Sequence, residues 1–155
     1  MTRDSLTLAD QKIGDMDYYA GSGLWRRAAT TPTAVTFAAG NFTADSGNWT
    51  LASGDQINFQ YSLLGKLMYV TWALQTTTVS ATPVYLKIAL PAGKTLAARS
   101  DGTHAFLDNG TQGIGYVLAN SGETFIRLYT GVALNTWATA TDTTASGGNI
   151  WVWVV

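Results

Sequence analysis

The sequence contains no cysteine among its 155 residues. Disulfide bonds, thiolate nucleophiles and cysteine-based zinc sites are therefore excluded, and a chain of this length can bury one core without such cross-links. Histidine is nearly absent too, since His104 is the only one. Any histidine-based triad or metal site would have to use this residue.

Charged residues are scarce as well, at 12% of the chain, whereas about a quarter is usual in globular proteins. The formal net charge is -1, and the only cluster of basic residues is Arg26-Arg27. The basic stripe that binds a nucleic-acid backbone is missing, so we expect no nucleic-acid partner. So few charges also predict that other protein copies cover part of the surface.

Several functional signatures are missing. Residues 1–10 carry Arg3 and Asp4 with no apolar run behind them, so we expect neither a signal peptide nor a membrane-spanning segment. The glycine-rich phosphate loops and the G-x-S-x-G nucleophile motif do not occur. The ten carboxylates are scattered, several of them in turns, and no pair stands out. We expect no cofactor, no metal and no enzymatic activity.

What the sequence does have is alternation of apolar and polar residues. In residues 56–63, Ile57, Phe59 and Tyr61 alternate with polar neighbours, which indicates a strand with one buried face. Residues 67–75 are apolar on both faces, which predicts a central or covered strand. The intervening Leu64-Gly65-Lys66 predicts a tight connection between the two.

Further strands are predicted at short spacing, separated by turn signals such as Asp108-Asn109-Gly110. These segments are residues 33–38, 49–52, 84–90, 103–107, 114–119, 124–130 and 149–155. Eight or nine strands with almost no helix predict an all-β fold, an antiparallel two-sheet sandwich of the jelly-roll kind. Residues 136–148 have a low-complexity composition and are expected to form a surface loop.

The segment before Thr33 has a different pattern. Residues 14–29 are polar, aromatic and glycine-rich without clean alternation, and Thr31-Pro32 separates them from the first predicted sandwich strand. We therefore divide the chain into an N-terminal attachment arm or small hairpin, residues 1–32, and a β-sandwich domain, residues 33–155.

Two stretches resemble bacteriophage tail-fibre and appendage proteins. The run Gly14-Asp15-Met16-Asp17-Tyr18-Tyr19-Ala20-Gly21, followed by Trp25-Arg26, resembles their G-D-x-x-Y-Y-x-G-x-x-W-x-R element, with one extra residue before the tryptophan. The run Tyr61-Ser62-Leu63-Leu64-Gly65-Lys66, with Trp72, the later turns and the tryptophan-rich end, is similar to the β-sandwich tip domains of such fibres. Together the two cover most of the chain.

The resemblance implies a structural subunit of the virion, assembled in the host cytoplasm and typically a homotrimer. The end of the chain, residues 150–155, is apolar on both faces, and a neighbouring subunit would cover the face that does not fill the core. The residues that we assign to this subunit interface are Trp72, Trp151 and Trp153. The residues that we assign to attachment to the particle are Tyr18, Tyr19, Trp25 and Arg26.

The aromatic residues favour glycan binding as the function. Proteins hold sugars with the faces of aromatic rings together with planar polar side chains, and the sequence has six Trp and seven Tyr. The candidate ligand-binding residues are Trp49, His104, Asp108, Asn109 and Trp137. Packing in the core is the alternative for each tryptophan. Three functions stay open: a fibre or spike tip that binds a host-surface glycan, a capsid decoration or head-fibre protein that binds only virion proteins, and, least favoured, a carbohydrate-active enzyme.

Overall fold

The computed structural model describes residues 11–13, 16–19, 24–27 and 31–155, with side chains from residue 31 onward. The chain divides into two compact units, Met1–Thr31 and Pro32–Val155. The boundary between them lies within the Thr31-Pro32 dipeptide, one residue before the end of the arm as we drew it from the sequence. Each unit is described by itself below.

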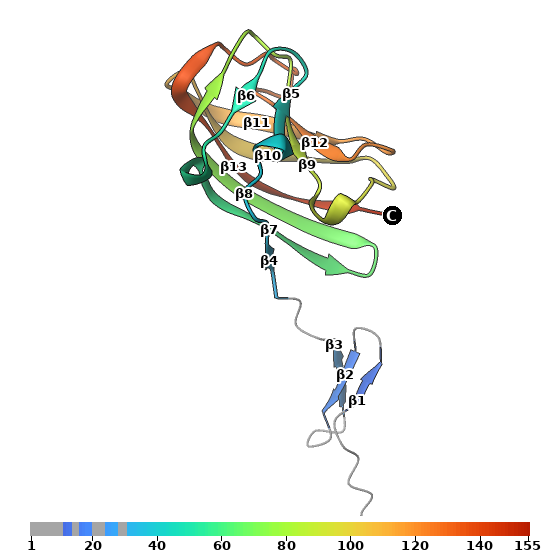
Figure 1. Ribbon diagram of the computed structural model, residues 1–155. Coiled ribbons are helices and arrows are strands. Elements are labelled where there is room, and N and C mark those ends of the chain that lie inside the picture. The colour runs from blue at the N-terminus through green and yellow to red at the C-terminus, as the bar shows by residue number, and fades with distance from the viewer. Residues whose placement is uncertain (1–10, 14–15, 20–23, 28–30) are drawn as a thin grey trace, which may run out of the picture. The chain divides into compact units, whose positions relative to one another are not determined.

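The first unit contains three short strands, β1 (Gln11–Ile13), β2 (Met16–Tyr19) and β3 (Leu24–Arg27). They form an antiparallel sheet in that order (Figure 1). All four residues assigned to virion attachment lie on β2 and β3, where Tyr18 pairs with Trp25. Their role in attachment stays a prediction.

The second unit is built on one antiparallel sheet of ten strands. Its strands are β4 (Thr33–Ala34), β5 (Phe42–Ala44), β6 (Trp49–Thr50), β7 (Gln56–Leu64), β8 (Leu67–Val79), β9 (Leu86–Ala89), β10 (Ser100–Asp108), β11 (Thr111–Ala119), β12 (Phe125–Tyr129) and β13 (Ala140–Trp153). Within residues 31–155, helix is limited to three short 3-10 turns, η1 (Ala39–Asn41), η2 (Ser53–Asp55) and η3 (Pro91–Gly93).

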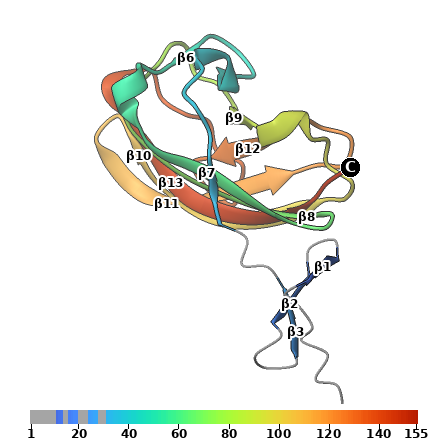
Figure 2. The same ribbon diagram turned by 60° about the horizontal axis from the view of Figure 1, so that its bottom comes forward.

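The strand order is β4-β7-β8-β13-β10-β11-β12-β9-β5, and β6 also pairs with β8. The sheet curls into a half-barrel around its core (Figure 2). The predicted all-β, antiparallel class is confirmed. A two-sheet sandwich or jelly roll is not confirmed, because the hydrogen-bonded ladder runs without a break from β4 to β5.

Local patterns predicted the central strands, but Ile57, expected on the buried face of residues 56–63, is 59% exposed, beside an irregularity in the pairing of β7 between Gln56 and Asn58. Strands β7 and β8 form the expected hairpin, with Leu64 paired to Leu67. The turn between β10 and β11 has Asn109 at φ 47° and Gly110 at φ 81°. Positive φ at both positions is what the type I′ two-residue hairpin turn requires, and Asn-Gly adopts it readily. The strand β5 was not predicted.

Strand β13 corrects the prediction of a surface loop at residues 136–148. It begins at Ala140 and is 14 residues long. Its first half pairs with both β8 and β10, so that Ser146 lies opposite Leu74 on one side and Phe106 on the other. The small residues that suggested a loop are instead the neighbours of large rings in the core.

Three aromatic rings in or against the core closely approach glycines of adjacent strands. A Cβ added to Gly148 would lie 2.8 Å from the His104 Cβ and 2.9 Å from the Trp72 ring. A Cβ on Gly115 would overlap the His104 ring and the Tyr129 carbonyl oxygen, and one on Gly113 would overlap the Phe106 ring. Only glycine leaves room for the rings at these positions.

We predict that Gly115→Ala lowers the free energy of unfolding by about 1–3 kcal/mol or more, because the added methyl group overpacks a filled core. The matched control is Gly54→Ala, since a Cβ there meets nothing within 4 Å. The control is expected to be neutral or stabilising by under about 1 kcal/mol. Urea denaturation of both variants measures the difference, and equal stabilities would contradict this account of the core.

Candidate functional site

Three side chains inside the half-barrel, those of Trp72, His104 and Ser146, form a connected hydrogen-bond network. The Trp72 Nε1 donates to Ser146 Oγ over 2.9 Å, and Ser146 Oγ lies 3.0 Å from His104 Nδ1. The His104 Nε2 lies 3.0 Å from the Tyr129 carbonyl oxygen. With its proton on Nε2, the neutral imidazole donates to Tyr129 and accepts from the Ser146 hydroxyl, so every member of the network has a partner.

A hydroxyl bonded to an imidazole is also the pair that activates a serine nucleophile. Here His104 and Ser146 are each only 2% exposed, which leaves the hydroxyl no surface for a substrate. Burial lowers the pKa of His104 and keeps the ring neutral. No group of three metal-ligating side chains occurs among the residues that the structure describes. The network serves the packing of the core.

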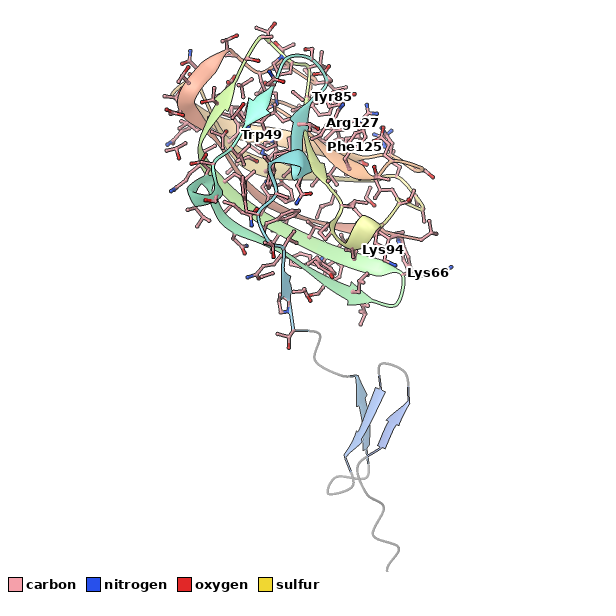
Figure 3. The ribbon with its side chains drawn as sticks, in the orientation of Figure 1. Trp49, Lys66, Tyr85, Lys94, Phe125 and Arg127 are labelled. Atoms are coloured by element: carbon pink, nitrogen blue, oxygen red, sulfur yellow. The ribbon has the colours of Figure 1, made fainter. Side chains whose placement is uncertain are left out.

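Three of the five predicted ligand residues are core residues, which corrects their assignment. Besides His104, the Trp49 side chain is buried and its Nε1 donates to Thr77 Oγ1 over 2.8 Å. Trp137 is fully buried and donates to the Leu128 carbonyl oxygen over 2.8 Å. A hollow of about 410 Å³ lies beside Trp49, whose position is labelled in Figure 3. The hydrogen bond from Trp49 Nε1 to Thr77 nevertheless holds the indole ring in the core. The residues before each tryptophan suggested a binding loop because they are polar. They are indeed exposed, but the tryptophan side chains are not.

Asp108 and Asn109 lie at the turn between β10 and β11. Both carboxylate oxygens of Asp108 accept the backbone N–H of Ala138, each over 3.1 Å. Partial burial raises the pKa of this carboxyl group. Asp108 therefore ties the turn to the segment that precedes β13, while Asn109 is exposed. Contact of these two residues with a ligand stays a prediction.

The residues assigned to the subunit interface fall into two groups. Trp72 is 2% exposed within the core, so its assignment to an interface is corrected. Trp151 and Trp153 are 51% and 52% exposed, because they alternate along β13 with buried residues that face the core. The Trp151 ring lies 4.7 Å from the Tyr69 ring, centroid to centroid. We call the exposed Trp151 and Trp153, together with the partly buried Leu67 and Tyr69 on the adjacent strand, the tryptophan ridge.

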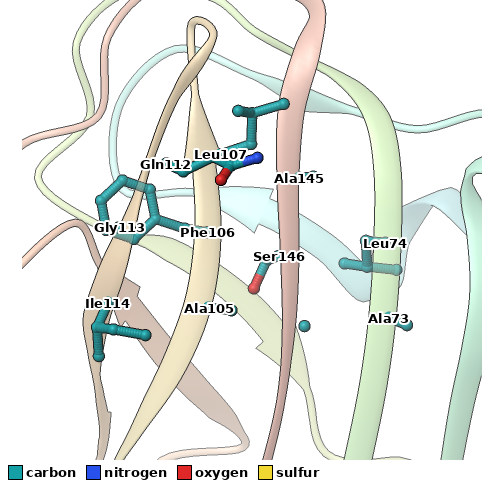
Figure 4. A pocket seen from close by; sticks show the side chains of 11 residues that line it. Ala73, Leu74, Ala105, Phe106, Leu107, Gln112, Gly113, Ile114, Ala145 and Ser146 are labelled. Atoms are coloured by element: carbon teal, nitrogen blue, oxygen red, sulfur yellow. The ribbon is translucent and has the colours of Figure 1, made fainter.

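Farther along the same face of β13 the surface is hollowed. Gly147 lies between Ala73 of β8 and Ala105 of β10, so three neighbouring strands present minimal side chains. The resulting hollow has a volume of about 580 Å³ (Figure 4). Ile114, 67% exposed, lines it as well. An apolar ridge and an apolar hollow thus occupy one face of the sheet.

A third feature of this face involves cations and lies on β9 and β12. Lys87 and Arg127 are directly opposite each other in the ladder, and the rings of Tyr85 and Phe125 lie beside both. None of these four residues was singled out from the sequence. The sequence alternation of Phe125 and Arg127 with apolar residues could have shown that their side chains lie on one face of a strand. It could not have shown that this strand pairs with β9, which carries Lys87.

The buried His104 predicts a pH dependence of stability. Its pKa is lower in the folded chain than the ordinary value of about 6.5, so the unfolded chain binds the proton more readily. The neutral, buried imidazole therefore contributes its full stabilisation above about pH 6.5, the pKa of the unfolded chain. This contribution is lost progressively as the pH falls below that pKa. We therefore expect the free energy of unfolding to decrease as the pH falls below about 6.5. In His104→Gln this slope should vanish, whatever the stability of the variant at neutral pH; an unchanged slope in urea titrations would refute the assignment.

The chain has no match among protein families, characterised proteins or solved structures. None of the described residues belongs to a helix long and apolar enough to cross a membrane. What the protein does is therefore inferred from its residues and from the geometry of the outer face.

Proposed function

We propose that this protein is a structural subunit of a bacteriophage particle, a small homotrimeric fibre or spike component that binds a host-surface glycan. The observation that carries the proposal is the tryptophan ridge, which leaves two large aromatic side chains half-exposed on a long central strand. The sequence elements that resemble appendage proteins support it. A capsid decoration or head-fibre protein is the alternative with the same architecture.

The tryptophan ridge favours association of subunits because it exposes a large apolar surface to water. A tryptophan can bury roughly 150–250 Å² of surface, and monomeric soluble proteins rarely expose a continuous apolar patch of several such residues. Trp151 and Trp153 are held in place by a strand whose alternate residues are fixed in the core. Three copies that turn the ridge on β8 and β13 toward a common axis would cover it, and the adjacent hollow offers space for a bulky side chain of a neighbour.

Replacing Trp153 by Asp should disrupt the assembly, because each copy would bury an unpaired charge at a cost of several kcal/mol. The control is Val132→Asp, which changes an equally apolar residue that is 78% exposed in a loop. Light scattering should give a trimer mass for the wild type and the control and a smaller mass for Trp153→Asp, with the thermal unfolding of each as a check on folding. A wild-type monomer at micromolar concentration would refute the proposed trimer.

The first unit is proposed to attach the subunit to the particle. It is compact by itself and carries the element that resembles those of appendage proteins. A chain that begins at Pro32 should therefore fold and assemble, since the described core lies wholly within the second unit, yet should no longer be incorporated into virions. Circular dichroism and the protein content of purified particles test the two halves of this prediction. If the shortened chain is unfolded, the first unit belongs to the core.

A further inference from the structure

Two cations face each other on the outer surface of the sheet, where a like-charge pair is unfavourable. Lys87 of β9 and Arg127 of β12 are direct cross-strand partners. Their neighbours along each strand are buried, so both side chains point away from the core. Like charges directly opposite destabilise a sheet. The second unit has only five basic residues, Lys66, Lys87, Lys94, Arg99 and Arg127, so this placement of two of them calls for a compensating partner.

Aromatic rings provide part of the compensation. The Arg127 guanidinium carbon lies 4.6 Å from the centre of the Tyr85 ring and 5.8 Å from that of Phe125. The Lys87 Nζ lies 5.5 Å and 5.2 Å from the same two rings. Figure 3 shows Tyr85, Phe125 and Arg127 together at one side of the molecule. Cations at these distances are attracted by the ring faces and are held in fixed positions.

Of the two cations, only Arg127 has a carboxylate partner. Glu123 pairs with Arg127, its Oε2 accepting from Nε over 3.1 Å and its Oε1 accepting from Nη2. Among the side chains that the structure describes, Lys87 has neither an ion pair nor a side-chain hydrogen bond. Its ammonium group has three donors. The Glu123 carboxylate pairs with Arg127, and the charge of Lys87 has no carboxylate partner among the described side chains.

We propose that the patch formed by Tyr85, Lys87, Phe125 and Arg127 binds a carboxylated sugar of an acidic surface polysaccharide. The sugar carboxylate would take the missing acceptor position between the two cations, and the apolar face of the sugar ring would lie against the aromatic side chains. A neutral sugar would leave the charge of Lys87 unmatched. This inference rests on the proposed glycan-binding function and names its ligand class.

Neighbouring residues favour a polymer over a single small acid. The Tyr85 ring is 5.5 Å from that of Tyr129, which is 6.4 Å from that of Tyr116. The Tyr116 hydroxyl in turn accepts from Arg99 Nη2 over 3.2 Å. Tyr129 is itself buried, so the accessible groups that continue from the patch are the partly buried Tyr116 of β11 and the exposed Arg99. A trimer would present three such surfaces, and weak contacts with a repeating glycan could combine through effective concentration.

Polygalacturonate is the probe, and the same polymer with its carboxyl groups reduced is the neutral comparison. Isothermal titration of the full chain should detect binding of the acidic polymer alone. Dextran sulfate serves as a second, non-carboxylate polyanion. If it binds as well as polygalacturonate, the patch attracts anions without recognising a sugar acid, and the proposal fails. Absence of binding to polygalacturonate also overturns it.

The matched variants are Lys87→Gln and Lys94→Gln, which each remove one positive charge from the second unit. Loss of a charge-assisted hydrogen bond should weaken binding by about tenfold or more in Lys87→Gln, whereas the control should stay within about twofold of the wild type. Equal losses would show a general electrostatic effect and refute the site. Both variants must keep the melting temperature of the wild type.

Two measurements distinguish a failure of the glycan site from a failure of the proposed function: the mass of the oligomer and the incorporation of the protein into virions. Both should be unchanged in Lys87→Gln, because the patch is assigned to glycan and not to protein. If incorporation is lost, the partner of the patch is a virion protein and the glycan site is refuted. If the wild type is neither a trimer nor part of a particle, the proposed function fails, whatever the titration shows.

Discussion

Large rings can lie inside a single curled sheet only where the facing strands carry almost no side chain. Trp72 and His104 occupy the space above Gly148, and Gly115 gives His104 the room to reach the carbonyl group of Tyr129. These five residues lie on β8, β13, β10, β11 and β12, which are consecutive strands of the sheet. Their contacts therefore connect half of its strands. A side chain at either glycine would force the rings outward and open the curl. The hydrogen-bond network, the burial of the core and the shape of the outer face all follow from this close approach.

The sequence predicted the parts of the fold that depend on neighbouring residues. The alternation in β7, the two apolar faces of β8 and the Asn109-Gly110 turn can each be recognised within a few positions. The first half of β13 could not be, because its Ser and Gly residues have the composition of a loop. They form a strand because Ser146 meets Trp72, 74 residues earlier, and His104, 42 residues earlier. Nothing in the local pattern contains that information.

The candidate site shows the same division. The alternation of Trp151 and Trp153 with Ile150 and Val152 predicts two apolar faces, one of which needs a second cover, but only the structure shows that the tryptophans are on the exposed face. Polar flanking residues were a poor guide for Trp49 and Trp137, since a loop can be exposed while its one large side chain turns into the core. The Lys87–Arg127 pair depends on the register between β9 and β12. That register is set by the packing of Ile88 against Ile126 on the opposite face, so the charges were brought together by the core.

The tryptophans of residues 31–155 also give the molecule two distinct optical reporters. Trp49, Trp72 and Trp137 are buried, with every indole N–H bonded inside the protein, and such side chains emit at short wavelength and resist collisional quenchers. Trp151 and Trp153 are half in water and emit at longer wavelength, within reach of acrylamide. Covering the ridge therefore changes only the second component of the fluorescence, whereas loss of the core changes the first. Association and unfolding can be followed separately in one unlabelled sample.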